Sequence, residues 1–223
     1  MTAYIFDSET TGLNDPQLVE AAWLKLDSMA GLSIIDQFLA RYKPSKPIEL
    51  GALATSHILD EELVDCPSHD TFALPTDTAF LIGHNVDYDW NVIGQPDIKR
   101  ICTQALSRKL WPSADSHTQS AMIYLHYRSE APTLLRNAHA ALDDVKNCHR
   151  LLMKIVEALS ERLGRPVAGW EELWLLSEDA RIPTHIGFGK HKGMAIADLP
   201  SDYKRWLLNQ ADLDPFVRKA LTR

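Results

Sequence analysis

The stretch that decides the fold is YIFDSETTGL (Tyr4–Leu13), an apolar run that carries Asp7 and Glu9 with one serine between them. Its aromatic and β-branched residues favour a strand, which the Thr-Thr-Gly segment ends. Residues two apart in a strand face the same side, so the two carboxyl groups project together. Such like charges repel each other and raise each other's pKa unless a cation lies between them. Either the strand end faces solvent, or a cation binds there.

The rest of the pattern predicts an α/β domain. Strand patterns at 18–27 and 32–44 follow the first strand through short connections, which predicts an antiparallel meander of three strands. The strongest helical signal is 142–164, where apolar residues recur every three or four positions and a glycine ends the pattern. Further strands are expected at 78–85 and at the start of 99–111, and further helices within 48–59, 87–94, 99–111, 116–127, 170–180 and 198–221.

The chain is also expected to divide into parts. Pro166 and Gly169 interrupt the pattern, so we expect a body over 1–165, a connector over 166–184 and a small C-terminal module over 185–223. The net charge of the whole chain is −7, yet the module carries seven Lys and Arg against four Asp and Glu. An acidic body with a basic module suggests a polyanionic partner together with an acidic pocket that needs cations.

The module contains a glycine-rich basic stretch, GFGKHKG, at 187–193. Its glycines with Lys190, His191 and Lys192 would bring N–H groups and positive charge to phosphates. The alternative is a solvated turn between a strand and a helix. The local positive charge favours a DNA contact or a docking site for a partner.

Three widely spaced cysteines form no CxxC pair and suit reduced thiols in a cytosol. The sequence shows no N-terminal targeting pattern, and no apolar run approaches the ~18 residues that a membrane span needs. We therefore expect a cytoplasmic protein without a membrane partner.

More acids occur where a site would need them. Asp87 follows a buried strand and lies near a helix start, where it would point into a cleft or cap the helix, and Asp89 competes for either role. His139 precedes Asp144 by five residues, which would place them ~140° apart on one helix. His139 therefore shares a site with Asp144 only from the loop before the helix. Asp143 and Asp144 are alternatively first-turn acids that the helix dipole favours.

Four carboxylates and one histidine on three elements are typical of a two-metal phosphodiester hydrolase. Carboxylate oxygens suit Mg²⁺ or Mn²⁺, and two such ions ~3.5–4 Å apart hold a phosphate in line between the attacking and leaving oxygens. Histidine, with an ordinary pKa near ~6.5, takes a proton from water at neutral pH. This interpretation explains why Asp7 and Glu9 lie in the strand.

Three stretches, FDSETTGL, GHNVDYDW and HAALDDV, resemble in order and approximate spacing the exonuclease motifs of the DEDDh, or DnaQ-like, 3′–5′ exonucleases. Two more, ICTQALSRKLWP and FGKHKGMAIADLPSDYKRWLLN, are similar to stretches of the exodeoxyribonuclease X branch of that family. The resemblance implies a ribonuclease H-like fold, a mixed five-stranded sheet flanked by helices with a small C-terminal module. It also implies stepwise release of 5′-mononucleotides from DNA 3′ ends, single- or double-stranded, and a role in DNA repair or replication clean-up.

The resemblance assigns catalytic roles to five residues of this sequence. Four acids would hold two Mg²⁺ or Mn²⁺ ions, and His139 would be the general base. Position 8, a serine, is expected to point away from the metals. The oligomeric state is left open, a homodimer included. The four acids are Asp7, Glu9, Asp87 and Asp144, and the residues expected to contact the nucleotide are Thr10, Thr11, Gly12, Leu13, His57 and Asn85.

Two alternatives remain at this stage. The same chemistry serves exoribonucleases and oligoribonucleases, and the choice depends on whether the pocket tolerates a 2′-hydroxyl. A catalytically silent module that binds nucleic-acid ends would lack one of the acids, whereas all four acids and the histidine are present.

Overall fold

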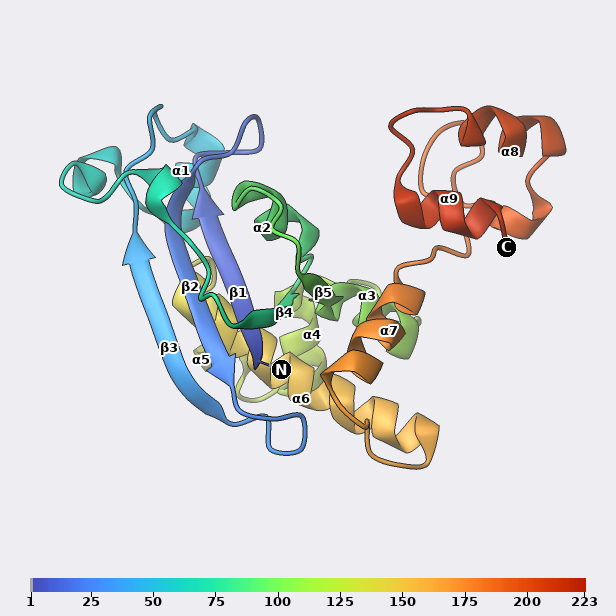
Figure 1. Ribbon diagram of the computed structural model, residues 1–223, viewed down its shortest axis with the longest axis horizontal. Helices are drawn as coiled ribbons and strands as arrows, with labels where there is room; N and C mark the ends of the chain where they lie inside the picture. The colour runs from blue at the N-terminus through green and yellow to red at the C-terminus, as the bar shows by residue number, and fades with distance from the viewer. Residues whose placement is uncertain (1) are drawn as a thin grey trace. The chain divides into compact units, whose positions relative to one another are not determined.

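The computed structural model describes residues 2–223, which form two compact units, the first ending at Ser177 and the second spanning Glu178–Arg223. The first unit contains a five-stranded sheet in the order β3-β2-β1-β4-β5 (Figure 1). β1, β2 and β3 form an antiparallel meander, and β4 and β5 run parallel to β1. The strands span Thr2–Thr10 (β1), Leu18–Leu26 (β2), Ile34–Arg41 (β3), Thr78–Gly83 (β4) and Lys99–Cys102 (β5).

β1 lies at the centre of the sheet because its first half is apolar on both faces. Ala3, Tyr4, Ile5 and Phe6 are all buried. The charged residues of β1 come only at its C-terminal end, which adjoins the parallel strand β4 and the helix that follows it. Carboxyl ends of parallel strands are the usual place for a site in such sheets.

Helix α6 covers one side of the meander, in contact with β1 and β2 (Figure 1). It begins at Ala141, and Gly164 ends it in the left-handed conformation (φ 67°). Its buried residues recur at helical spacing and include Val145, Cys148 and Leu152. The helices of this unit are α1 (Leu50–Ser56), α2 (Asp87–Val92), α3 (Thr103–Leu110), α4 (Gln119–His126), α5 (Ala131–Leu134), α6 (Ala141–Leu163) and most of α7 (Trp170–Ala180), with 3₁₀ turns at Asp60–Leu63 and His69–Thr71.

The mixed five-stranded sheet flanked by helices confirms the predicted fold class. Both strand-to-helix transitions, into α2 and into α3, lie where the pattern placed them. The short helix α5 and the 3₁₀ turns had no periodic signal and were not predicted.

The structure divides the chain later than the predicted boundary at residue 165. Trp170 and Leu173 of α7 are buried, and the Ser177 hydroxyl accepts a hydrogen bond from the Cys102 N–H at 2.8 Å. Lys99 Nζ lies 2.6 Å from Glu171 Oε2. Part of the predicted connector, residues 170–177, is therefore a docked helix of the first unit.

The second unit packs around a small apolar core of its own. Ile186, Ile196, Leu199 and Leu207 are buried together. The unit contains a 3₁₀ turn (Ile196–Asp198), α8 (Ser201–Leu208) and α9 (Pro215–Leu221), which correspond to the two helical pieces that the sequence predicts. Over residues 2–223, no helix is both long and apolar enough to cross a membrane.

Candidate active site

The site begins at the C-terminal end of β1. Asp7 and Glu9 are partly buried, and Glu9 lies directly opposite Glu20 of β2 in the antiparallel register. Glu20 is itself buried, with 5% of its surface exposed. Three carboxyl groups are therefore concentrated at one end of the sheet, as the sequence predicted for the first two.

Asp89, rather than Asp87, is the acid that α2 adds to this group. Asp89 is buried, and its charge acts directly on Asp7 and Glu9. Asp87 instead forms an ion pair with Arg100, whose guanidinium also lies 3.8 Å from the centroid of the Trp90 ring. Two residues along a helix differ by ~200° in direction, so the two acids cannot face the same side. The prediction chose the wrong one of the two.

Ser8 holds Asp89 in place. The Ser8 N–H and hydroxyl both donate hydrogen bonds to Asp89 Oδ1, at 3.0 and 2.7 Å. The expectation that this side chain points away from the site was wrong. The serine between Asp7 and Glu9 orients a third acid from another element.

His139 and Asp144 meet at the start of α6. His139 is exposed, lies in the loop before the helix and has a left-handed backbone (φ 70°). This turn lets the His139 N–H donate to Asp144 Oδ2 at 2.9 Å, while Gln119 Nε2 donates to Asp144 Oδ1 at 3.0 Å. Ligand atoms of Glu9, His139 and Asp144 lie within 4.8 Å of one another. The loop placement that the five-residue spacing required is confirmed.

Gln119 was not predicted as part of the site. It is the first residue of α4, 25 residues before Asp144 in the chain, and belongs to none of the three motifs. Only the contact of α4 with α6 brings it to the carboxylate.

Glu20 anchors the start of α6 to the sheet. The residue before the helix, Ala140, supplies no side-chain cap, and Glu20 Oε2 instead accepts a hydrogen bond from the Ala141 N–H at 3.1 Å. Glu20 Oε1 pairs with Arg41 at 3.0 Å, and Arg41 also pairs with Glu62 at 2.9 Å. This carboxylate therefore supplies from β2 the cap that the helix lacks, and it fixes the segment between His139 and Asp144 against β1.

The pKa values of the clustered acids show the cost of bringing them together. Burial, followed by the charges of the neighbouring acids, raises the pKa of Glu9 to about 8 and holds that of Asp7 well above its ordinary value. Burial likewise raises the pKa of Asp89 to about 7, against the lowering effect of the two Ser8 hydrogen bonds. Burial also raises the pKa of Asp144. Without a cation, Glu9 and Asp89 retain protons that ordinary carboxyl groups have lost near pH 7.

A divalent cation fits this donor set. In the described part of the chain, residues 2–223, no lysine or arginine forms an ion pair with Asp7, Glu9, Asp89 or Asp144. Carboxylate oxygens are the ligands that Mg²⁺ and Mn²⁺ prefer, and a bound cation would relieve the repulsion between the clustered acids. The chemistry of the residues therefore agrees with the predicted metal dependence.

The loop after β1 uses its polar groups to hold its own shape. The Thr10 hydroxyl lies 2.6 Å from the Tyr88 hydroxyl, and Tyr88 donates to the Gly12 carbonyl at 3.1 Å. The Thr11 hydroxyl is buried and accepts from the Gln17 N–H at 3.1 Å. Leu13 is 82% exposed. For nucleotide contact this leaves mainly the Leu13 side chain and backbone groups, and the two threonine hydroxyls are already occupied.

The other two predicted nucleotide contacts are both exposed. His57 ends α1 with a left-handed backbone (φ 57°), and Ile58 after it is buried against a small apolar cluster. Asn85 also has a left-handed backbone (φ 70°) just before α2. Its own carbonyl, which accepts from the Tyr88 N–H at 3.1 Å, forms the turn.

Comparison with known proteins finds exonucleases that are similar to this chain. Over 224 residues the chain is 27% identical to exodeoxyribonuclease 10 of Escherichia coli strain K12, with 97% of this chain and 96% of the relative covered. No protein-family model matches the chain. The expected resemblance to the exodeoxyribonuclease X branch is confirmed, and with it the enzyme class, an exonuclease.

Solved structures give the same result for the fold. A structure of exonuclease X with 5′-overhanging duplex DNA matches with a TM-score of 0.60 and 24% identity, covering 78% of this chain and 99% of that chain. The nuclease domain of 3′hExo, described as a DEDDh family member bound to rAMP, matches with a TM-score of 0.50 and 13% identity over 70% of this chain and 92% of that chain. The fold is that of the DEDDh exonucleases. In this fold the clustered acids lie on β1, on α2 after β4, and on α6.

Proposed function

We propose that this protein is a metal-dependent 3′–5′ exodeoxyribonuclease that releases 5′-mononucleotides from DNA. The observation that carries the proposal is the convergence of Asp7, Glu9, Asp89 and Asp144, with raised pKa values, beside the exposed His139. The likeness to exodeoxyribonuclease 10 supports DNA as the substrate.

In this proposal the four acids bind two divalent ions, Mg²⁺ or Mn²⁺. When bound, the ions would orient the phosphate and neutralise the charge that develops on it. His139 accepts the proton of the attacking water at an imidazole nitrogen. Its exposure and its backbone bond to Asp144 allow the ring to reach the phosphate from the solvent side. Ser8 and Gln119 hold Asp89 and Asp144 at fixed angles.

RNA is a second candidate substrate, because the structurally similar nuclease domain of 3′hExo is described with bound rAMP. Paired 5′-labelled DNA and RNA oligonucleotides of one sequence, incubated with Mg²⁺, Mn²⁺ or EDTA, decide between them. We expect metal-dependent shortening of the DNA from its 3′ end, absent in the Asp7→Asn variant. Shortening of RNA alone would transfer the proposal to an exoribonuclease, and no shortening with either ion would favour the silent end-binding module.

The cellular role, in DNA repair or replication clean-up, and the cytoplasmic location stay predictions, as does a homodimer. The preference for single- or double-stranded ends is read from the same assay by adding a duplex with a recessed 3′ end.

A further inference from the structure

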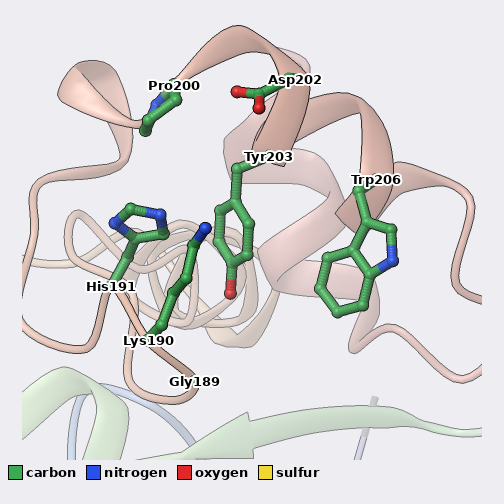
Figure 2. A pocket seen from close by; sticks show the side chains of 7 residues that line it. All are labelled: Gly189, Lys190, His191, Pro200, Asp202, Tyr203 and Trp206. Atoms are coloured by element: carbon green, nitrogen blue, oxygen red, sulfur yellow. The ribbon is translucent and has the colours of Figure 1, made fainter.

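The second unit, Glu178–Arg223, contains a pocket of its own. It is an open cavity of about 530 Å³, within the range of sites that hold small organic ligands. A loop forms one wall and α8 the other (Figure 2). The residues used below are Gly189, Lys190 and His191 from the loop and Asp202, Tyr203 and Trp206 from α8.

One wall of the pocket is an aromatic platform. Tyr203 and Trp206, three residues apart on α8, stack with ring centroids 5.4 Å apart and an interplanar angle of 24°. Trp206 is 53% exposed, whereas Trp170 of the first unit is 7% exposed. A large, rigid aromatic ring held in place by a stacked neighbour and open to solvent is the surface on which unpaired bases stack.

The opposite wall is positively charged and pressed against the platform. Lys190 Nζ lies 5.7 Å from the centroid of the Tyr203 ring, and the His191 ring packs edge-on against Tyr203 with the ring centroids 4.5 Å apart (Figure 2). Gly189 has φ +66°, and a Cβ there would lie 2.8 Å from the Tyr203 hydroxyl. Only glycine therefore lets the loop approach the platform so closely.

His191 provides an independent indication of a ligand. Its Nε2 atom is buried and has no hydrogen-bond partner among the described residues. A buried, unpartnered ring nitrogen costs free energy in the absence of a partner. His191 lines the pocket beside Lys190, so its ring lies next to any polar group that enters there.

We propose that this pocket binds one nucleotide of single-stranded DNA, with the base stacked on Trp206 and the adjoining phosphate at Lys190 and His191. The excess of Lys and Arg over Asp and Glu in residues 185–223 favours an anionic chain over a cationic one. The inference rests on the proposed function only for the choice of DNA as the polymer. In this proposal the GFGKHKG stretch belongs to a DNA-binding site, which is the DNA contact that its charge favoured over a solvated turn.

The test measures binding without catalysis. Full-length protein in EDTA is titrated into a 5′-fluorescein-labelled oligo-dT of about 12 nucleotides, within the range of known single-strand sites, and anisotropy is recorded at several salt concentrations. We expect Trp206→Ala to weaken binding about tenfold or more, the effect of losing one stacked base. Lys190→Gln should reduce the slope of log K against log salt by about 0.7 as well as the affinity.

Matched variants separate the site from general charge and folding effects. Lys219→Gln removes the same charge from an exposed position of α9 outside the pocket and should bind like the unaltered protein. Trp206→Phe keeps a stacking ring and should retain most of the affinity. Asp202→Asn removes the negative charge from the pocket and should strengthen binding of an anion.

Unchanged affinity for oligo-dT in both Trp206→Ala and Lys190→Gln would overturn the proposal. Weaker binding of oligo-dT by Asp202→Asn would also overturn it, because it would indicate that the pocket suits a cationic ligand. An acidic peptide that competes with the oligo-dT at lower concentration than unlabelled oligo-dT would also overturn it. Because EDTA suppresses metal-dependent cleavage, a negative result in this binding experiment leaves the exonuclease proposal standing. A negative exonuclease assay likewise leaves the binding proposal standing.

Discussion

At the residue scale, the site depends on which face of a short helix an acid occupies. Asp87 and Asp89 are both near the start of α2, and both suit a helix N-terminus by type. The structure separates them, because Asp89 is buried beside Ser8 and Asp87 pairs with Arg100. This separation makes the two acids a matched pair for mutation.

Asp89→Asn should reduce kcat on 5′-labelled DNA by at least about a hundredfold, because it removes a proposed metal ligand and a charge that the bound ions need. Asp87→Asn should change kcat less than about threefold, since Asp87 pairs with Arg100 in a partly exposed ion pair worth about 0–1 kcal/mol. Rates are measured at saturating Mg²⁺. A larger loss of kcat in Asp87→Asn than in Asp89→Asn would instead indicate that Asp87 is a metal ligand.

The raised pKa values make metal binding dependent on pH. Because the pKa values of Glu9 and Asp89 lie near 8 and 7 in the metal-free protein, the folded state binds more protons than the unfolded state between about pH 4 and pH 8. These groups therefore destabilise the metal-free fold as the pH rises through that window. Divalent ions replace those protons when they bind, so the stabilisation that they provide should increase as the pH rises.

We expect the rise in Tm on adding Mg²⁺ to be larger at pH 8 than at pH 5.5. The difference between scans with Mg²⁺ and with EDTA removes the contribution of groups outside the cluster. One such group is His84, whose pKa burial lowers to about 4. In Asp89→Asn the pH dependence of the difference should shrink. An equal Tm shift at both pH values would contradict the coupling between protons and metal.

At the scale of elements, α6 supplies Asp144 and positions His139, and Glu20 holds its start against the sheet. Because the cap comes from β2 rather than from the helix itself, the geometry of the site depends on a residue that touches no substrate in the proposal. Glu20 is thus a positioning residue.

Glu20→Ala should lower the free energy of unfolding by about 1–3 kcal/mol, since it leaves the buried Ala141 N–H without an acceptor. It should also lower kcat more than it changes KM, and it should alter the pH–rate profile of the reaction. Glu20→Gln keeps an acceptor and should recover most of the activity.

The control is Glu62→Gln, which removes the other partner of Arg41 at the surface and leaves the helix cap intact. It should leave kcat and the pH–rate profile unaltered. A loss of stability in Glu20→Ala with an unchanged pH–rate profile would show that Glu20 serves only the fold.

The strands and the long helix were predictable from the sequence, because the apolar runs of β1, β2 and β4 and the three- to four-residue period of α6 reflect burial directly. The loop position of His139 followed from helix geometry alone. Ser8, Gln119 and Glu20 could not be assigned their roles, since each acts through a partner on another element. The choice between Asp87 and Asp89 needed the direction of α2 relative to β1, which no local pattern contains.

At the scale of the whole molecule, the boundary between the two units follows packing rather than composition. Pro166 and Gly169 marked a break, but α7 returns to the first unit and buries Trp170 and Leu173 there. A proline and a glycine interrupt a helix without ending a domain.

Two truncations test the boundary. A chain ending at residue 180 keeps α7 and should unfold cooperatively with nuclease activity on short substrates. A chain ending at residue 165 loses two large buried side chains, each worth about 1.5–3 kcal/mol of burial, and should be much less stable. Thermal unfolding by circular dichroism measures both. Equal Tm values would place the boundary at 165 after all.

The order in which the acids occur along the chain has a consequence for synthesis on the ribosome. Asp7 and Glu9 are made first and form the centre of the sheet, but their partner Asp144 follows more than 130 residues later, on α6. Since contacts this distant in sequence form late, the site cannot assemble while the chain is still short. A nascent or prematurely terminated chain that ends before α6 would therefore be harmless to nucleic acid, and cleavage would be confined to molecules whose first unit is complete.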